Sequence, residues 1–149
     1  MMITGGNNYS PYKTSFAGFL FECYILFINI MTEIQLKRAY DEASPSDGYR
    51  VYIDRLWPRG LSHETFHYDH WDKDIAPSTE LREWFHADPE GRWDEFEKRY
   101  ASELESNPAF DALVAEVRTK PVVTLLYSSH DREHNNAVVV AAALSKRLH

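Results

Sequence analysis

The chain has 149 residues, 44% of them hydrophobic and 26% charged, which is enough for one globular domain with a substantial core. Its formal net charge of −7 at pH 7 disfavours non-specific nucleic-acid binding, because such binding needs a basic surface. The single cysteine, Cys23, excludes an internal disulfide framework and a cysteine-rich metal site, and it fits a reducing, cytoplasmic compartment.

The first thirty residues differ from the rest of the chain. Residues 1–30 carry one lysine and one glutamate, and their apolar stretch of 15 residues, 16–30, is shorter than the ~20 needed to span a bilayer. We interpret residues 1–30 as an extension that precedes a natural start at Met31, from an upstream start codon or added by cloning. An interfacial helix on a partner or membrane surface and an ordinary element of the core are the alternatives.

Short segments with β-type patterns alternate with turn residues in the next part of the chain. Residues 34–38 alternate between apolar and polar side chains, which predicts a half-buried edge strand. Residues 44–48 (SPSDG) form a turn cluster, and residues 49–54 predict the next strand. A weaker alternation at residues 66–71 predicts a short strand or an extended segment.

Helical patterns dominate the second half. Three helix starts show a capping residue before the first turn: Ser78, Asp88 before Pro89, and Asn107 before Pro108. Apolar residues at helical spacing follow each start and predict helices, the first over residues 79–86. Residues 122–127 (VVTLLY) predict a buried strand, and a last helix is expected over about residues 132–147.

This order of elements predicts one α/β domain over residues 31–149, with a small, mostly parallel sheet of three or four strands flanked by helices. In such sheets ligands sit beyond the carboxyl ends of the strands. Two polar clusters fall there, at residues 54–60 (DRLWPRG) and 128–136 (SSHDREHNN). We therefore expect the two clusters to meet on one rim of the sheet.

The first cluster carries two arginines on a restrained loop. Trp57 precedes a proline and is held extended, and Gly60 permits a positive φ. Arg55 and Arg59 can then hold a carboxylate or phosphate between their guanidinium groups. An internal ion-pair network, with Asp54 paired to one arginine and an acidic residue of the second cluster paired to the other, is an equally good interpretation.

The second cluster places two serines before a helix start, a geometry that favours anions. It lacks the glycines of a nucleotide-binding loop, and its own acidic residues would cap the helix and repel a phosphate. A histidine beside Asp131, either His130 or His134, can serve as a general base, with one of the two serines as nucleophile.

Histidines four residues apart occur at His130/His134 and His63/His67, a spacing that can ligate zinc on a helix. Neither pair falls clearly on a predicted helix, so we favour surface or hydrogen-bonding histidines and expect neither a metal nor another cofactor. Three tryptophans are expected to pack in the helical layer rather than to stack on nucleic-acid bases: Trp71, Trp84 and Trp93.

Three ordered motifs cover roughly residue 34 to the C-terminus: VYIDRLWPRG, WDKDIAPSTELREWFHADPEGRWDEFEKRY and VVTLLYSSHDREHNNAVVV. Together they resemble the YeaO-like proteins, a family of small bacterial proteins with a domain of unknown function. The resemblance implies a compact α/β domain and a cytosolic bacterial protein, and it supplies no established activity. Its motif positions within the two clusters are Asp54, Arg55, Trp57, Pro58, Arg59, Gly60, Asp131, His134 and Asn135.

Two functions fit this pattern. In the first, the domain binds a small polar or anionic ligand at the strand ends, with or without an enzymatic reaction. The candidate catalytic residues are then Asp54, His130, Asp131 and His134, and the candidate ligand-binding residues are Arg55, Trp57, Arg59, Ser128 and Asn135. In the second, it is a non-catalytic protein-interaction module, which predicts an exposed apolar patch and fully paired charges at the strand ends. Nucleic-acid association is disfavoured, and no membrane association of the domain is expected.

Overall fold

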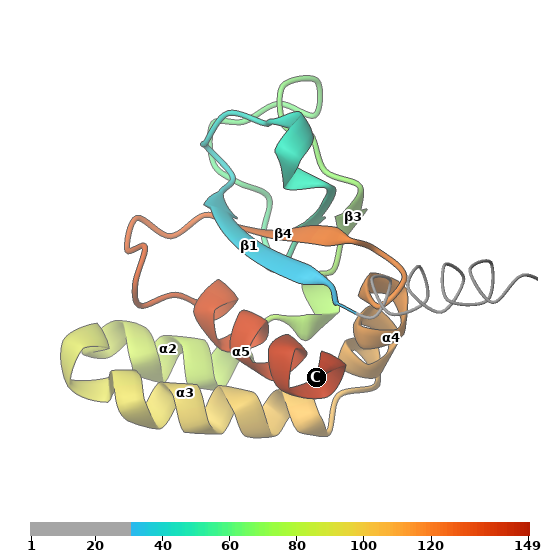
Figure 1. Ribbon diagram of the computed structural model, residues 1–149. Coiled ribbons are helices and arrows are strands. Elements are labelled where there is room, and N and C mark those ends of the chain that lie inside the picture. The colour runs from blue at the N-terminus through green and yellow to red at the C-terminus, as the bar shows by residue number, and fades with distance from the viewer. Residues whose placement is uncertain (1–30) are drawn as a thin grey trace, which may run out of the picture.

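The computed structural model describes residues 31–149, so the interpretations of residues 1–30 lie outside the described residues. Within that range the chain forms a four-stranded sheet and four helices (Figure 1). The strands are β1 (Glu33–Arg38), β2 (Tyr49–Tyr52), β3 (His70–Trp71) and β4 (Val122–Tyr127). The helices are α2 (Thr79–Ala87), α3 (Pro89–Glu105), α4 (Pro108–Val117) and α5 (Asn136–Leu148), and two 3-10 turns are η1 (Pro45–Asp47) and η2 (Lys73–Ile75).

The sheet is parallel throughout, with its strands in the order β1-β4-β2-β3. This confirms the expected single α/β domain and places the predicted edge strand, β1, at an edge. β4 is last in the chain but lies between β1 and β2, and its Leu125 aligns with Leu36 on one side and Val51 on the other. Because all strands point the same way, the segments that follow β1, β2 and β4 reach the same rim.

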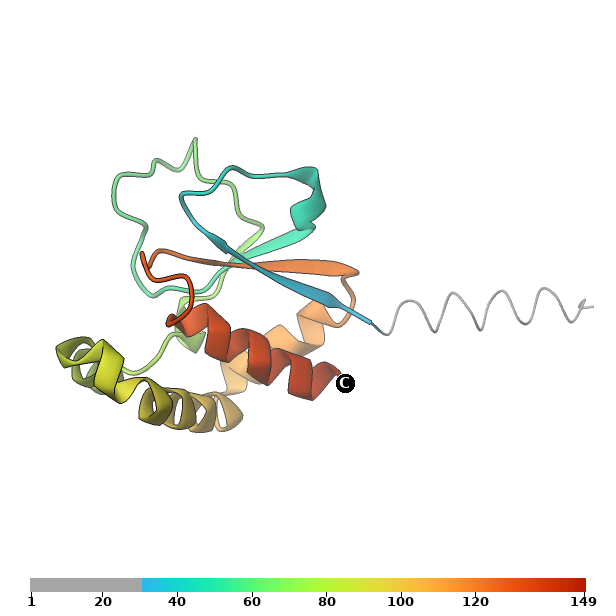
Figure 2. The ribbon, with the colours of Figure 1, turned by 60° about the vertical axis from the view of Figure 1, so that its left-hand side comes forward.

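The α-helices cover one face of the sheet, and loops with the short η1 turn cover the opposite face, as Figures 1 and 2 both show. Along β4, Val123 and Leu125 join a large core against the helices, whereas Leu126 joins a smaller core on the loop side. The smaller core also contains Tyr52 of β2 and Phe66 of the following loop. The sheet is therefore buried on both faces, although helices cover only one.

The three predicted helix starts are confirmed by their capping bonds. The Ser78 hydroxyl accepts from the Leu81 amide at 3.2 Å, and the Asp88 carboxylate accepts from the Gly91 amide at 3.1 Å. The side-chain oxygen of Asn107 caps α4 in the same way. These side chains satisfy amides that the first helical turn leaves without partners, so local chemistry fixes where the helices begin. In the described part of the chain, no helix has both the length and the apolar character needed to cross a bilayer.

The last helix begins later than predicted. α5 starts at Asn136, with Asn135 as its cap, rather than near Arg132. The Asp131 carboxylate accepts from the amides of Glu133 and His134, both at 2.9 Å, and this local turn competes with helix formation. His134 therefore lies before the helix, as His130 does.

The expected tryptophan cluster is only partly correct. Trp84 and Trp93 pack against the large core on the helical side of the sheet. Trp71 instead packs on the loop side, with its ring centroid 5.5 Å from that of Trp57. Its position in the short edge strand β3 sends its side chain to that face. The strand expected over residues 122–127 is confirmed with its predicted bounds, and the strand expected over residues 34–38 begins one residue earlier. The strand expected over residues 49–54 ends at Tyr52.

Candidate functional site at the carboxyl ends of the strands

The two polar clusters meet, and Asp54 is the residue that joins them. Its Oδ2 accepts from the Ser128 amide at 2.9 Å and from the Ser128 hydroxyl. Its Oδ1 accepts from Asn136 Nδ2 at 2.7 Å. Residues after β2, after β4 and at the start of α5 are thus held together through one half-buried carboxylate.

Asp54 is also fixed through its backbone and its neighbours. Its carbonyl oxygen accepts from Trp71 Nε1 at 2.7 Å. The Tyr52 hydroxyl donates to the Leu56 carbonyl at 2.7 Å and lies 3.4 Å from Asp54 Oδ2. Burial, followed by the nearby Asp54 charge, raises the pKa of Tyr52 above its usual range, so this phenol stays a neutral donor. The loop after β2 is therefore anchored at several points.

The second cluster is organised by Asp131. Hydrogen bonds from the amides of His134 and Glu133 lower the pKa of the Asp131 carboxyl, which keeps it ionised. His134 Nδ1 lies 3.3 Å from Asp131 Oδ2, and its ring centroid is 4.9 Å from that of Trp93. Asn135 is buried, and its Nδ2 donates to the Asp131 carbonyl at 2.9 Å. Asp131 and Asn135 thus shape the turn that leads into α5.

Arg38, at the end of β1, is a rim residue that the sequence patterns missed. Its guanidinium donates to the carbonyls of Ser129 at 2.7 Å and Ser128 at 3.3 Å, and its Nη2 lies 3.4 Å from His130 Nδ1. The expected parallel sheet already implied this position, because the last residue of β1 reaches the same rim as the last residue of β4. Arg132 forms a two-pronged pair with Asp41, at 2.9 and 3.0 Å, whose hydrogen bonds lower the pKa of Asp41.

The two arginines that were expected to hold an anion together share no hydrogen-bond partner within residues 31–149. Arg55 Nη2 donates to the Pro77 carbonyl at 3.4 Å, whereas the Arg59 side chain makes no hydrogen bond or ion pair within residues 31–149. Both side chains are exposed. Contrary to the ion-pair interpretation, Asp54 pairs with neither arginine in the described chain. The fully paired charges expected of an interaction module are also not found, because Arg59 has no charged partner within residues 31–149. The Arg59 carbonyl instead anchors Tyr40, whose hydroxyl donates to it at 2.8 Å.

Trp57 supports the loop rather than facing an open site. Its Nε1 donates to the Leu61 carbonyl at 2.7 Å, and its ring packs edge-on against Phe66 and beside His63, with a centroid distance of 3.8 Å to the latter. Burying an indole with its N–H bonded stabilises a loop that has no regular backbone pairing. This agrees with the expected restraint of the segment.

The hydrogen bonds at the rim do not form a nucleophile–base pair. The Ser128 hydroxyl donates to Asp54, and within residues 31–149 it makes no hydrogen bond to a histidine. His130 and His134 contact Arg38 and Asp131 respectively. Over the described range no three His, Cys, Asp or Glu side chains are grouped to hold a metal ion. The polar side chains of the rim mainly satisfy one another.

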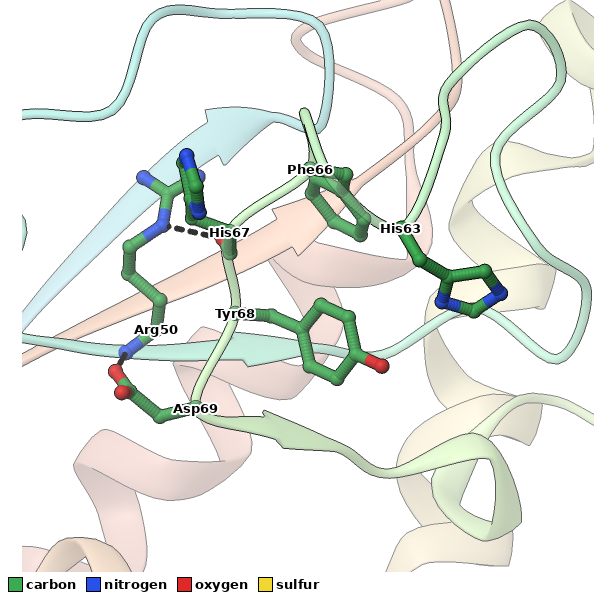
Figure 3. A pocket seen from close by; sticks show the side chains of 6 residues that line it. All are labelled: Arg50, His63, Phe66, His67, Tyr68 and Asp69. Carbon is green, nitrogen blue, oxygen red and sulfur yellow. Dashed lines mark hydrogen bonds between the residues drawn. The ribbon is translucent and has the colours of Figure 1, made fainter.

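Two hollows lie away from this rim. One, of about 540 Å³, is on the loop side of the sheet and is lined by Arg50, His63, Phe66, His67, Tyr68 and Asp69 (Figure 3). Arg50 is largely buried there: its Nε donates to the His67 carbonyl at 2.8 Å and its Nη1 pairs with Asp47. The other, of about 470 Å³, lies between α2 and α3 beside Trp84. The sequence patterns predicted neither.

The fold and rim define a small α/β domain whose strand-end polar groups are joined by a central aspartate. The chain belongs to the family described as the inactive DUF488-N3 subclade, whose model matches residues 33–149. It is 44% identical over 108 residues to the uncharacterized protein YeaO of Escherichia coli (strain K12), covering 72% of this chain and 93% of that protein. These findings confirm the resemblance drawn from the three motifs.

A second relative comes from another bacterium. The uncharacterized protein Rv3073c of Mycobacterium tuberculosis (strain ATCC 25618 / H37Rv) is 39% identical over 116 residues, covering 78% of this chain and 97% of its own length. No solved structure matches the chain significantly. The two alignments therefore cover nearly the whole length of each relative.

Proposed function

We propose that this domain is a non-catalytic protein-interaction module in which the strand-end cluster has a structural role. The observation that carries the proposal is the engagement of the Asp54 carboxylate by Ser128 and Asn136. An acid/base or nucleophilic mechanism at the strand ends would need such groups free to meet a substrate. The description of the matching family as inactive is consistent with this role.

The contact surface that we propose is formed by exposed residues that follow β1 and β2 at the same rim. It consists of Tyr40, Arg55, Leu56 and Arg59, and we call it the rim surface. Leu56 is 66% exposed and Tyr40 is 40% exposed, although both are large and hydrophobic. Tyrosine and arginine side chains are enriched at binding hot spots, and exposed apolar side chains that gather in a patch mark interaction surfaces. Arg59 has no charged partner within residues 31–149, so a polypeptide that presents carboxylates beside an apolar side chain fits this surface best.

Site-specific photo-crosslinking in cells that express the protein tests the proposal. A photoreactive amino acid at position 56 should give one discrete adduct with a second protein, and adding Arg59→Glu should abolish it. With the captured partner purified, Leu56→Ala should weaken binding roughly tenfold, as expected for a hot-spot side chain. The same probe at Lys98, exposed on α3, is the control. Equal adducts from both positions, or none from position 56, would refute the rim surface.

Binding of a small anionic ligand at the rim is a second candidate function. Two observations favour it: the Asp131–His134 pair is exposed, and Arg59 has no charged partner within residues 31–149. These residues follow β4 and β2, which are neighbouring parallel strands. Thermal-shift titrations with inorganic phosphate and succinate on the wild type and Arg59→Ala separate the candidates. Stabilisation of the wild type that disappears in Arg59→Ala supports ligand binding. No shift in either protein is the outcome expected of the interaction module.

A further inference from the structure

β1 is an edge strand, and some of its backbone groups point away from β4. The amides of Glu33 and Ala39 donate to β4-side carbonyls, at 2.9 and 2.7 Å, so the odd-numbered residues of this segment pair with β4. Successive peptide groups of a strand point in opposite directions, so those of Ile34, Leu36 and Arg38 face away from the sheet. β1 therefore presents three residues whose backbone groups can accept another strand.

The backbone groups of one of these three residues, Arg38, already have hydrogen-bond partners. The Arg38 amide donates to Asp41 Oδ2 at 2.9 Å, and the Arg38 carbonyl accepts from the Asp41 amide at 3.0 Å. Within residues 31–149, no hydrogen bond engages the outward peptide groups of Ile34 and Leu36. Of the β1 residues, judged from the described part of the chain, Ile34 and Leu36 remain open to another strand. A protein must cover or blunt such an edge to avoid uncontrolled pairing.

The side chains of β1 differ between its two faces. Ile34 packs against the large core on the helical side, and Leu36 on the same face is 36% exposed at the sheet edge. On the loop side, Lys37 pairs with Asp47 at 2.6 Å, and Glu33 is exposed. The edge thus offers an incompletely covered apolar face and a polar face with charges of opposite sign at its two ends.

We propose that two copies of this chain pair through β1, antiparallel, around a two-fold axis at Gln35. In this register Ile34 lies opposite the partner's Leu36, so the open peptide groups of the two strands satisfy one another. The same pairing covers each exposed Leu36 with an isoleucine. On the other face, Glu33 lies opposite the partner's Lys37, an opposite-charge cross-strand pair. The two sheets join into one continuous sheet of eight strands.

The closed end of the strand selects this register. Moving the axis by one residue to Leu36 would place Ile34 opposite the partner's Arg38, whose backbone groups Asp41 already occupies. That register would also remove the contact between Glu33 and Lys37. The self-complementary edge is short, so the dimer is expected to depend on protein concentration. This inference does not depend on the proposed function, because the rim surface is not part of the β1 edge.

Register-specific disulfide formation tests the pairing in the full chain. In a Cys23→Ser background, Gln35→Cys places two thiols opposite each other, in a pair whose Cα atoms are about 4.5 Å apart. This distance is within the range that a disulfide needs. Mild oxidation should convert most of this variant into a covalent dimer. Glu33→Cys, which is more exposed than Gln35 but opposite the partner's Lys37, should stay largely monomeric. Equal crosslinking of the two variants, or faster crosslinking at position 33, would overturn the register.

Sedimentation of a backbone variant provides a second readout. Leu36→Pro removes an outward amide and leaves the bonds to β4 in place, because proline is tolerated where an edge N–H faces solvent. The wild type should shift from monomer to dimer as its concentration rises, whereas Leu36→Pro should remain a monomer with an unchanged far-ultraviolet circular dichroism spectrum. A wild type that stays monomeric at the highest soluble concentration would overturn the proposal.

Discussion

At the scale of single residues, the buried carboxylates of this domain respond to pH in opposite directions. Burial opposes the charge of Asp47, yet hydrogen bonds from Lys37, Ser44 and Arg50 outweigh it and lower the pKa of this carboxyl below 3.8. Asp47 therefore stabilises the fold above about pH 4, and its contribution is lost as the pH falls through the lowered pKa. Burial raises the pKa of Asp72, and the neighbouring His70 offsets this only in part. Its charge costs stability at neutral pH.

Asp72→Asn should therefore stabilise the protein at pH 7. Because the pKa of Asp72 is higher in the folded state than in the unfolded state, ionisation of this carboxyl destabilises the fold. This destabilisation is absent below about pH 3.8, where the carboxyl is protonated in both states, and it grows as the pH rises. We expect a gain on the order of 1 kcal/mol in the free energy of unfolding at pH 7, shrinking toward zero below pH 3.8. Urea unfolding at both pH values measures it. Asp94→Asn, at an exposed position of α3, is the control. A loss of stability for Asp72→Asn at pH 7 would contradict the assignment.

At the scale of elements, two glycines with positive φ perform different tasks. Gly48 ends η1 with φ 61° and ψ −130°, and a Cβ there would collide with the Val122 carbonyl at the start of β4. Gly60 has φ 83°, but nothing lies within 4 Å of the place where its Cβ would be. The first glycine therefore serves both a turn and a close approach of two segments, and the second serves only a turn.

Alanine substitution should separate these two tasks. Gly60→Ala should cost about 1 kcal/mol, because only backbone strain is added. Gly48→Ala should cost about 3 kcal/mol or more, because strain is joined by a collision with backbone that cannot move without disturbing β4. Chemical denaturation of the two variants provides the comparison. Equal losses would show that Val122 shifts freely and that the contact has no energetic consequence.

Local signals predicted the elements well where one side chain decides the structure. Ser78, Asp88 and Asn107 fixed three helix starts, because each cap bond forms within a few residues. The start of α5 was placed too early because Asp131 and Asn135 can both cap, and only the folded chain shows that Asp131 closes a separate turn. β3 is shorter than its pattern suggests, because two residues are all that pair with β2.

At the scale of the whole molecule, parallel strands explain why the rim could be anticipated and its contacts could not. Strand direction alone brings residues after β2 and β4 together. The order of strands, with β4 beside β1, decides that Arg38 joins the rim. The position of α5 decides that Asn136 reaches Asp54. Strand order and helix position depend on long-range packing, which no local pattern contains.

Amide hydrogen exchange should follow this architecture. β4 is paired on both sides and β2 is its buried neighbour, so the amides of Leu125 and Leu126 should be among the slowest to exchange. The loop at residues 54–69 has no strand or helix and should exchange orders of magnitude faster, despite its aromatic core. Mass spectrometry of exchanged peptides resolves these regions. Comparable protection of the loop and β4 would show that the aromatic loop layer unfolds only with the whole domain.

The place of β4 in the sheet has a consequence for synthesis. β1 and β2 are made early, yet neither pairs with the other, because residues 122–127 must insert between them. While β4 is still inside the ribosome, the nascent polypeptide has two apolar segments with no central strand to unite them. The sheet can close only after residues 122–127 have emerged, and a chain cut short before β4 has no route to a stable product.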